Sequence, residues 1–245
     1  MTEAIFSLTR DYEIKCKLFA PEDGEIKQII VGVHGFAGDK DSSMLKRLAK
    51  ACNECALLCF DFPAHGKSPA TEEHFTIENC KKDLLFVCDY VRKNYPDAKK
   101  AVFATSFGGY ITLHCLDNLS DFVPVLRAPA ITMADILVDN VLKLTVEDFS
   151  NAGRIICGFE RKIDLPFSFY TEMRDLPTLL REFPKREMLI IHGDLDNIVP
   201  PPVIYEFAEK NSFVTLKIIE GADHRFKNRG EIDTVVTYTK EFIGI

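Results

Sequence analysis

The sequence predicts an α/β protein built on a mostly parallel β-sheet with helices on both faces. Apolar segments of strand length alternate with amphipathic segments of helix length along most of the chain, which is the order that right-handed βαβ crossovers produce. The 245 residues, 47% of them hydrophobic, can also form one large core. We therefore expect a single domain over residues 1–245, although two smaller domains would also fit this length.

The first two strands are expected to be antiparallel and the third to be buried. Residues 4–8 and 13–19 alternate in polarity, and the turn residues at 21–24 close the second strand. Residues 28–34 (QIIVGVH) form a continuous run rich in β-branched side chains. Such a run is typical of a strand that is covered on both faces.

The remaining elements repeat this alternation until an interruption. Helices are expected at 42–52, 77–95, 107–119, 201–210 and 231–242, and strands at 56–62, 101–105, 121–126, 188–192 and 213–219, which brings the sheet to eight strands. Residues 127–184 contain helical pieces without a strand rhythm. Because this stretch is too long for a plain loop, we expect an insertion that covers the ligand-binding edge of the sheet as a lid.

The composition excludes several classes of function. The formal net charge is −7, from 30 lysines and arginines against 37 aspartates and glutamates, so the chain lacks the basic surface that binds a phosphate backbone. No apolar run approaches the roughly 20 residues of a membrane helix, and the first residues lack the pattern of a secretion signal. We expect a soluble, cytoplasmic protein with no nucleic-acid or membrane partner.

The eight cysteines are expected to remain free thiols. The closest three, Cys52, Cys55 and Cys59, run from an expected helix end into an expected strand, which would scatter their sulfur atoms. No second CxxC pair or neighbouring histidine completes a tetrahedral metal site. We therefore expect no metal and no cofactor.

Ser106 lies in the segment ATSFGG (104–109), where an expected strand meets an expected helix. Small residues two positions before and two after a serine allow a sharp turn that exposes the hydroxyl, and the first amides of the helix face developing negative charge. Ala104 stands where the usual G-x-S-x-G pattern has glycine. Taken alone, the segment is equally compatible with a serine that only caps a glycine-rich helix start.

An acid and a histidine follow Ser106 in the order that a catalytic triad requires. The strand expected after the interruption is followed by Asp194 and Asp196, and the next strand by His224. Parallel strands deliver their carboxyl ends to one edge of the sheet, so these side chains can meet there. His34 and His192 end expected buried strands and are expected to hold loops by hydrogen bonding.

With these motifs the chain resembles the α/β-hydrolase family over essentially its whole length. The matching segments are HGF (34–36), DFPAHGKS (61–68), the Ser106 turn, HGDLD (192–196) and GADH (221–224). Within the family it is most similar to compact bacterial carboxylesterases with an inserted lid, including cinnamoyl and feruloyl esterases, and less similar to monoacylglycerol lipases. The resemblance implies the α/β-hydrolase fold and a serine esterase.

Acyl-transfer chemistry then assigns a role to each residue. His224 is expected to take the proton of Ser106, and a carboxylate to orient the imidazole. We choose Asp196 for that carboxylate, because the H-G-x-x-D spacing of similar sequences ends there, and expect Asp194 to cap the turn. The oxyanion hole is expected to use the backbone N–H of Phe107, which follows the nucleophile, and by resemblance that of Phe36.

Residues 127–184 are expected to contribute an apolar or aryl acyl pocket as well as their own small core. In the cinnamoyl esterases that this region resembles, an inserted aspartate and a tyrosine bind the phenolic hydroxyls, which implies Asp135 and Tyr170 here. A surface carboxylate and a packed tyrosine remain the alternative. The expected substrate is a small-molecule ester, such as a hydroxycinnamate ester.

Several other functions stay open on the sequence alone. Hydrolysis of monoglycerides, acyl thioesters or peptides would use the same residues. A slow or non-catalytic ligand-binding protein of this fold is the alternative outside enzymes. A homodimer is also kept open.

Overall fold

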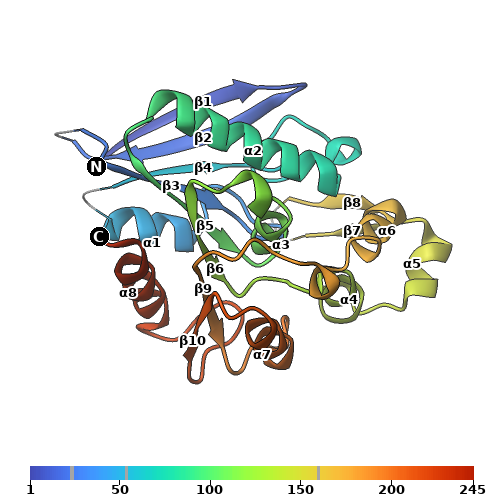
Figure 1. The fold of residues 1–245 in the computed structure, drawn as a ribbon. Coiled ribbons are helices and arrows are strands. Elements are labelled where there is room, and N and C mark those ends of the chain that lie inside the picture. Colours follow the sequence, from blue (N-terminus) through green and yellow to red (C-terminus); the bar gives the residue numbers. More distant parts are fainter. Residues whose placement is uncertain (23–24, 53–54, 159–160) are drawn as a thin grey trace.

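The computed structural model describes residues 1–22, 25–52, 55–158 and 161–245. Within these residues, eight strands form one sheet in the order β1-β2-β4-β3-β5-β6-β9-β10 (Figure 1). Their bounds are Thr2–Thr9 (β1), Glu13–Ala20 (β2), Gln28–Val33 (β3), Ala56–Phe60 (β4), Lys99–Thr105 (β5), Phe122–Arg127 (β6), Met188–Gly193 (β9) and Val214–Ile219 (β10). β2 pairs antiparallel with β1 and β4, and all other neighbours are parallel. The expected mostly parallel sheet is confirmed.

Helices cover both faces of this sheet. Their bounds are Ser43–Ala51 (α1), Ile77–Asn94 (α2), Phe107–Leu113 (α3), Pro201–Lys210 (α7) and Glu231–Ile243 (α8), with a 3-10 turn at Glu72–His74. α1 and α8 contact each other on one face (Figure 1), where they share a core with Ile30 and Leu57. α2, α3 and α7 pack on the other face with Ile29 and Val31. Successive strand side chains therefore enter opposite helix layers, which explains why β3 is buried throughout.

The stretch between β6 and β9 contains more regular structure than expected. It holds α4 (Met133–Asp135), a π-helix (Ile136–Leu142), α5 (Val146–Ala152), β7 (Arg154–Cys157), β8 (Ile163–Pro166), α6 (Phe167–Arg174) and a 3-10 turn (Thr178–Leu180). β7 and β8 form an antiparallel hairpin that the sequence analysis missed, because strands of four residues give too short a pattern. Figure 1 shows β7, β8, α5 and α6 at the end of the molecule away from the termini. Their role as a lid stays a prediction.

The helix expected over 107–119 ends early. α3 stops at Leu113, and a 3-10 turn at Leu116–Asn118 follows. The Thr112 hydroxyl donates to the carbonyl oxygen of Gly108 at 2.8 Å, and Cys115 N–H donates to Thr112 O at 3.0 Å in the tighter i→i+3 pattern. Such bonds compete with the regular helical ladder.

Of the turn expected at 21–24, residues 23 and 24 lie outside the described residues.

Three general features concern the described part of the chain only. No helix there is long and apolar enough to cross a membrane. No disulfide joins the cysteines, and all of them except Cys157 are buried. No group of three His, Cys, Asp or Glu side chains among these residues could hold a metal ion.

The start of α3 packs closely against the end of β3. A Cβ added to Gly108 would lie 2.5 Å from the carbonyl oxygen of His34 and 2.9 Å from that of Val33. These are backbone atoms at the end of a buried strand, so they cannot move aside without disturbing the sheet. Glycine at this position therefore sets how closely the turn at Ser106 approaches the loop after β3.

The variant Gly108→Ala should lower the free energy of unfolding by about 1–3 kcal/mol, the usual cost of overpacking a rigid contact. Urea unfolding followed by circular dichroism measures this change. Gly244→Asn is the control, because Gly244 has φ +75° and an added Cβ there meets nothing within 4 Å, and asparagine tolerates the left-handed region. If Gly108→Ala unfolded at the same urea concentration as the wild type, the close packing of α3 on β3 would be wrong.

Candidate active site

Ser106 occupies a strained turn between β5 and α3. Its φ is +50° and its ψ is −113°, a region that residues other than glycine rarely adopt. Three hydrogen bonds hold this backbone: Ser106 N–H donates to Arg127 O at 3.0 Å, and Ser106 O accepts from Tyr110 N–H and Ala130 N–H, each at 3.1 Å. The ends of β5 and β6 are thus joined at the serine, and the surrounding structure maintains a conformation that would otherwise cost about 1–3 kcal/mol.

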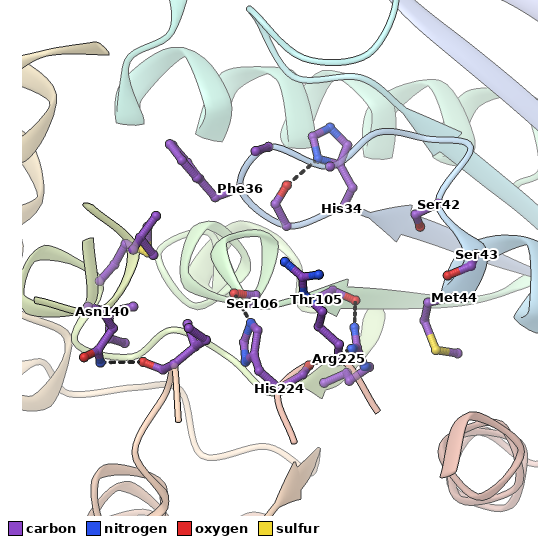
Figure 2. Close-up of a pocket in the computed structure, with 18 of the residues that line it drawn as sticks. His34, Phe36, Ser42, Ser43, Met44, Thr105, Ser106, Asn140, His224 and Arg225 are labelled. Atoms are coloured by element: carbon purple, nitrogen blue, oxygen red, sulfur yellow. Dashed lines mark hydrogen bonds between the residues drawn. The ribbon is translucent and has the colours of Figure 1, made fainter. Parts of the chain in front are cut away.

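His224 meets the Ser106 side chain from the loop after β10. The two atoms His224 Nε2 and Ser106 Oγ are 3.1 Å apart, as the dashed line in Figure 2 shows. On its other side, His224 Nδ1 lies 2.7 Å from Asp196 Oδ2. A carboxylate can only accept, so Nδ1–H donates to Asp196, and Nε2 is left to accept the serine hydroxyl proton. This geometry suits proton transfer from the hydroxyl to the imidazole.

Asp196 is the aspartate that contacts His224, as the sequence analysis expected, and Asp194 is not. Asp196 is buried, and its second oxygen, Oδ1, accepts from the backbone N–H groups of Ile198 at 2.9 Å and Val199 at 2.8 Å. These two bonds fix the carboxylate. Asp194 Oδ1 instead accepts from Gly221 N–H at 2.6 Å and joins the two loops that carry Asp196 and His224.

The loop after β3 passes beside Ser106 and carries the second expected oxyanion donor, Phe36. A Cβ added to Gly35 would lie 3.3 Å from the Cβ of Ser106. Phe107 opens α3, where the first N–H groups have no acceptor inside the helix. Among the described residues, no acceptor is hydrogen bonded to the N–H of Phe36 or of Phe107. Both groups are therefore available to a ligand oxygen, although their roles remain a proposal.

A buried histidine holds this loop in place. His65 Nε2 accepts from Ala37 N–H at 3.0 Å, while His65 Nδ1–H donates to Pro63 O at 2.8 Å. Burial lowers the pKa of His65 to about 3, so its ring stays neutral and Nε2 remains an acceptor. Arg161 Nη1 donates to the carbonyl oxygens of His65 at 3.2 Å and Ser68 at 2.9 Å and supports the turn from outside. The sequence analysis gave His65 no role, although it lies within a motif of the resemblance.

The other end of the loop is held by a buried ion pair. Lys40 Nζ lies 2.8 Å from Asp61 Oδ2, and Lys40 N–H donates to Asp61 Oδ1 at 2.8 Å. Both side chains are almost fully buried.

As the sequence indicated, His34 and His192 hold loops: His34 Nε2 accepts from Phe62 N–H at 3.1 Å, and His192 Nε2–H donates to Val199 O at 3.0 Å.

A cavity of about 700 Å³ opens above Ser106 and His224. One side is formed by the π-helix region, with Met133, Ile136, Asn140, Val141 and Ile198. The other side is more polar and includes Ser42, Ser43, Met44, Thr105, Arg127 and Arg225. Figure 2 shows Asn140 on one side of Ser106 and Ser42, Ser43 and Met44 on the other. A substrate bound over Ser106 would therefore meet two chemically different walls.

Neither expected aryl-binding residue lines this cavity. Asp135 is exposed at the surface. It lies on the same short helix as Met133, which does line the cavity together with Ile136, and successive helical residues are turned by about 100°, so Asp135 points away. Tyr170 is buried, and its ring stacks on Phe167 with centroids 5.5 Å apart.

The sequence analysis also missed Arg127, whose only signal was a charge at the end of an apolar strand.

Comparisons with known proteins bear on the fold. A family profile described as alpha/beta hydrolase fold matches residues 28–126. Among solved structures, ferulic-acid-bound Est1E from Butyrivibrio proteoclasticus superimposes with a TM-score of 0.81 at 22% identity, over 97% of each chain. The chain has the α/β-hydrolase fold. Mouse alpha/beta hydrolase domain-containing protein 10 shares this α/β-hydrolase fold with a TM-score of 0.78 at 19% identity, over 98% of each chain.

A putative hydrolase from Agrobacterium vitis S4 gives the same picture of the α/β-hydrolase fold. Its TM-score is 0.78 at 18% identity, over 99% of this chain and 98% of that one. No curated protein sequence matches the chain. At these identities the solved structures show the fold, and the site is argued from its own geometry.

Acidification should destabilise this α/β-hydrolase fold through its buried histidines. His65 has a pKa lowered by burial to about 3, and His114 to about 4, against an unfolded value of about 6.5. The unfolded chain therefore binds more protons below about pH 6.5, and the free energy of unfolding falls as pH decreases. We expect a loss of about 1 kcal/mol per histidine between pH 7 and about pH 5.5.

Urea unfolding at both pH values, for the wild type, His65→Gln and His114→Gln, measures this dependence. Each variant should lose less stability on acidification than the wild type, whatever its stability at pH 7. Asp83 acts in the opposite sense, since burial raises its pKa to about 6, but it is present in all three proteins. Equal losses in all three would contradict the assignment of neutral, buried histidines.

Proposed function

We propose that the protein is a serine hydrolase that cleaves carboxylic esters through an acyl-enzyme on Ser106. The observation that carries the proposal is the continuous chain of contacts from Asp196 Oδ2 to His224 Nδ1 at 2.7 Å and from His224 Nε2 to Ser106 Oγ at 3.1 Å. These three residues are far apart in sequence and come from three loops at one edge of the sheet. Such a set is expected of a nucleophile, its base and the group that orients the base.

The proposed mechanism follows from the direction of these hydrogen bonds. As Ser106 Oγ attacks the ester carbonyl carbon, His224 takes the hydroxyl proton, and Asp196 stabilises the resulting imidazolium. The N–H groups of Phe36 and Phe107 stabilise the carbonyl oxygen as it becomes negative, which is worth about 3 kcal/mol for each donor. His224 then gives its proton to the leaving alcohol, and a water activated by the same imidazole releases the acid.

The π-helix side of the cavity supports an apolar or aryl group on the substrate. Ile136, Val141 and Ile198 line that side with Met133, and apolar walls with a few polar groups are usual for small-molecule sites. A hydroxycinnamate ester is the finer proposal. It is supported by the likeness to Est1E, which was solved with ferulic acid, and it does not depend on Asp135 or Tyr170.

The triad assignment predicts a large loss of turnover in two variants. Ser106→Ala should abolish hydrolysis of p-nitrophenyl butyrate, and Asp196→Asn should lower kcat by about three to four orders of magnitude, because the imidazole loses its orienting carboxylate. The assay follows release of p-nitrophenolate. Asp194→Asn is the matched control and should retain most activity, because Asp194 joins two loops without contacting His224.

Turnover of Ser106→Ala equal to that of the wild type would eliminate the proposal. Labelling by a fluorophosphonate probe adds a second measurement. Rapid labelling of Ser106 with negligible turnover of p-nitrophenyl, monoglyceride and thioester substrates would favour a ligand-binding protein over an esterase.

The finer proposal is tested with methyl ferulate. We expect it to be hydrolysed, and we expect Asp135→Asn to hydrolyse it at the wild-type rate, since that carboxylate is exposed and lines no part of the cavity. The acid product is measured by chromatography, with methyl butyrate as the reference ester. A failure on methyl ferulate alone would remove the hydroxycinnamate proposal and leave the esterase proposal standing.

A further inference from the structure

The polar side of the cavity contains a buried arginine. Arg127 is the last residue of β6 and is only 7% exposed. Its Nη2 donates to His224 O at 2.9 Å, and its Nη1 lies 3.5 Å from Thr105 Oγ1. The centre of its guanidinium lies 4.7 Å from the centroid of the Phe226 ring. Since Arg127 also lines the cavity, it is placed within reach of a ligand bound at Ser106.

This guanidinium has no counterion in the described part of the chain. Arg127 takes part in none of the ion pairs found there, and its buried Nε–H has no hydrogen-bond acceptor. The aspartates that act on it most act from a distance and make no direct ion pair with it: Asp196 is hydrogen bonded to His224, and Asp223 pairs with Lys227 at 2.8 Å. Burial lowers the pKa of Arg127 to about 10, so the side chain is still a cation at neutral pH.

Burying an unpaired cation is costly, and a structural role alone does not require it. The contacts with His224 O and Thr105 Oγ1 need two N–H donors, which a neutral amide side chain could supply without burying charge. The Phe226 ring offsets only part of the cost of the cation. A guanidinium, by contrast, offers five N–H donors and suits carboxylate oxygens particularly well. The uncompensated charge of Arg127 is therefore explained if the ligand brings the missing anion.

The charges around the cavity also favour an anionic ligand. Arg225 also lines it, and Lys143, the residue after the π-helix, lines it from the π-helix side. Among the described residues that line the cavity, none is an aspartate or a glutamate. This is unusual in a chain whose net charge is −7. The Arg127 guanidinium contacts Thr105. In Figure 2, Thr105 lies on the side of Ser106 away from Asn140. The side with Arg127 thus lies across Ser106 from the side of the π-helix, which is mostly apolar and ends in Lys143.

We propose that the substrate is an ester that carries a carboxylate on one side of the scissile bond and an apolar group on the other, with Arg127 binding the carboxylate. This inference rests on the proposed function of Ser106 and adds a substrate class to it. Arg127 binds the anion, while the reacting atoms remain those of Ser106 and His224. The carboxylate can belong to the acid or to the alcohol of the ester, and the experiment separates these two cases.

The test uses two pairs of esters in which a carboxylate is replaced by its neutral methyl ester. Mono-p-nitrophenyl glutarate is compared with its neutral methyl ester, which places the carboxylate on the acyl side. 4-Carboxyphenyl butyrate is compared with 4-(methoxycarbonyl)phenyl butyrate, which places it on the alcohol side. In the wild type, the anionic member of at least one pair should have a kcat/KM about tenfold or more above its neutral partner, as expected for a charge-assisted hydrogen bond. The pair that shows the preference identifies the side.

Arg127→Gln keeps an N–H donor for His224 O and removes the charge. The ratio of kcat/KM between anionic and neutral esters should fall about tenfold or more from its wild-type value in this variant, mainly through KM for the anionic ester. Any general loss from a displaced His224 affects both members of a pair and cancels in the ratio. Arg154→Gln is the matched control, because Arg154 pairs with Asp164 on the exposed hairpin and lines no part of the cavity, and it should keep the wild-type ratio.

The outcomes separate the two proposals. If no ester of either pair is hydrolysed above the Ser106→Ala background, the proposed function fails. If all are hydrolysed but the wild type shows no preference for the anionic members, this inference fails and the esterase stands. If the preference persists in Arg127→Gln, Arg127 is not the anion-binding residue. Should that variant not fold, competitive inhibition of the wild type by glutarate or 4-hydroxybenzoate decides the matter, and absence of inhibition by both overturns the proposal.

Discussion

The backbone of Ser106 can hold its left-handed conformation only because two neighbouring strands are joined at that point. The N–H of Ser106 is bonded to the last carbonyl of β6, and its carbonyl is bonded to Ala130, just beyond the same strand. The carbonyl that accepts from Ser106 N–H belongs to Arg127. The side chain of Arg127 also donates to the carbonyl oxygen of His224. One residue at the end of β6 therefore contacts both the turn at Ser106 and the loop that carries His224. The hydroxyl and the imidazole are positioned relative to each other through this shared neighbour.

The loop after β3, which carries Phe36, is held by two buried polar side chains rather than by a strand. Asp61 binds the backbone and the side chain of Lys40, and His65 binds the backbone of Ala37. These contacts hold both ends of the loop that presents Phe36 next to Ser106. Amide groups stabilise a developing negative charge most effectively when they are already oriented before the reaction begins. For the proposed role of Phe36, that orientation is supplied by the loop after β4.

The sequence predicted the sheet and the meeting of Ser106, Asp196 and His224 because both are encoded by strong local patterns. β3 reads as an unbroken apolar run since it has helices on both faces, and the positions of Ser106, Asp196 and His224 follow from the rule that parallel strands end at one edge. The hairpin of β7 and β8 could not be predicted, because strands so short are stabilised by their surroundings more than by their own residues. Arg127 was missed for a related reason: its side chain contacts Phe226 and His224, which are distant in sequence.

The π-helix at Ile136–Leu142 has a consequence for how this site could vary. Ile136, Asn140 and Val141 all face the cavity, a spacing of four and five residues that fits the wider turn of a π-helix. Removing a single residue from this segment would return it to ordinary α-helical pitch. The side chains after the deletion would then rotate by about 100° about the axis. Loss of one codon would therefore replace the apolar side of the cavity without altering the sheet, the contacts among Ser106, Asp196 and His224, or the loop that carries Phe36.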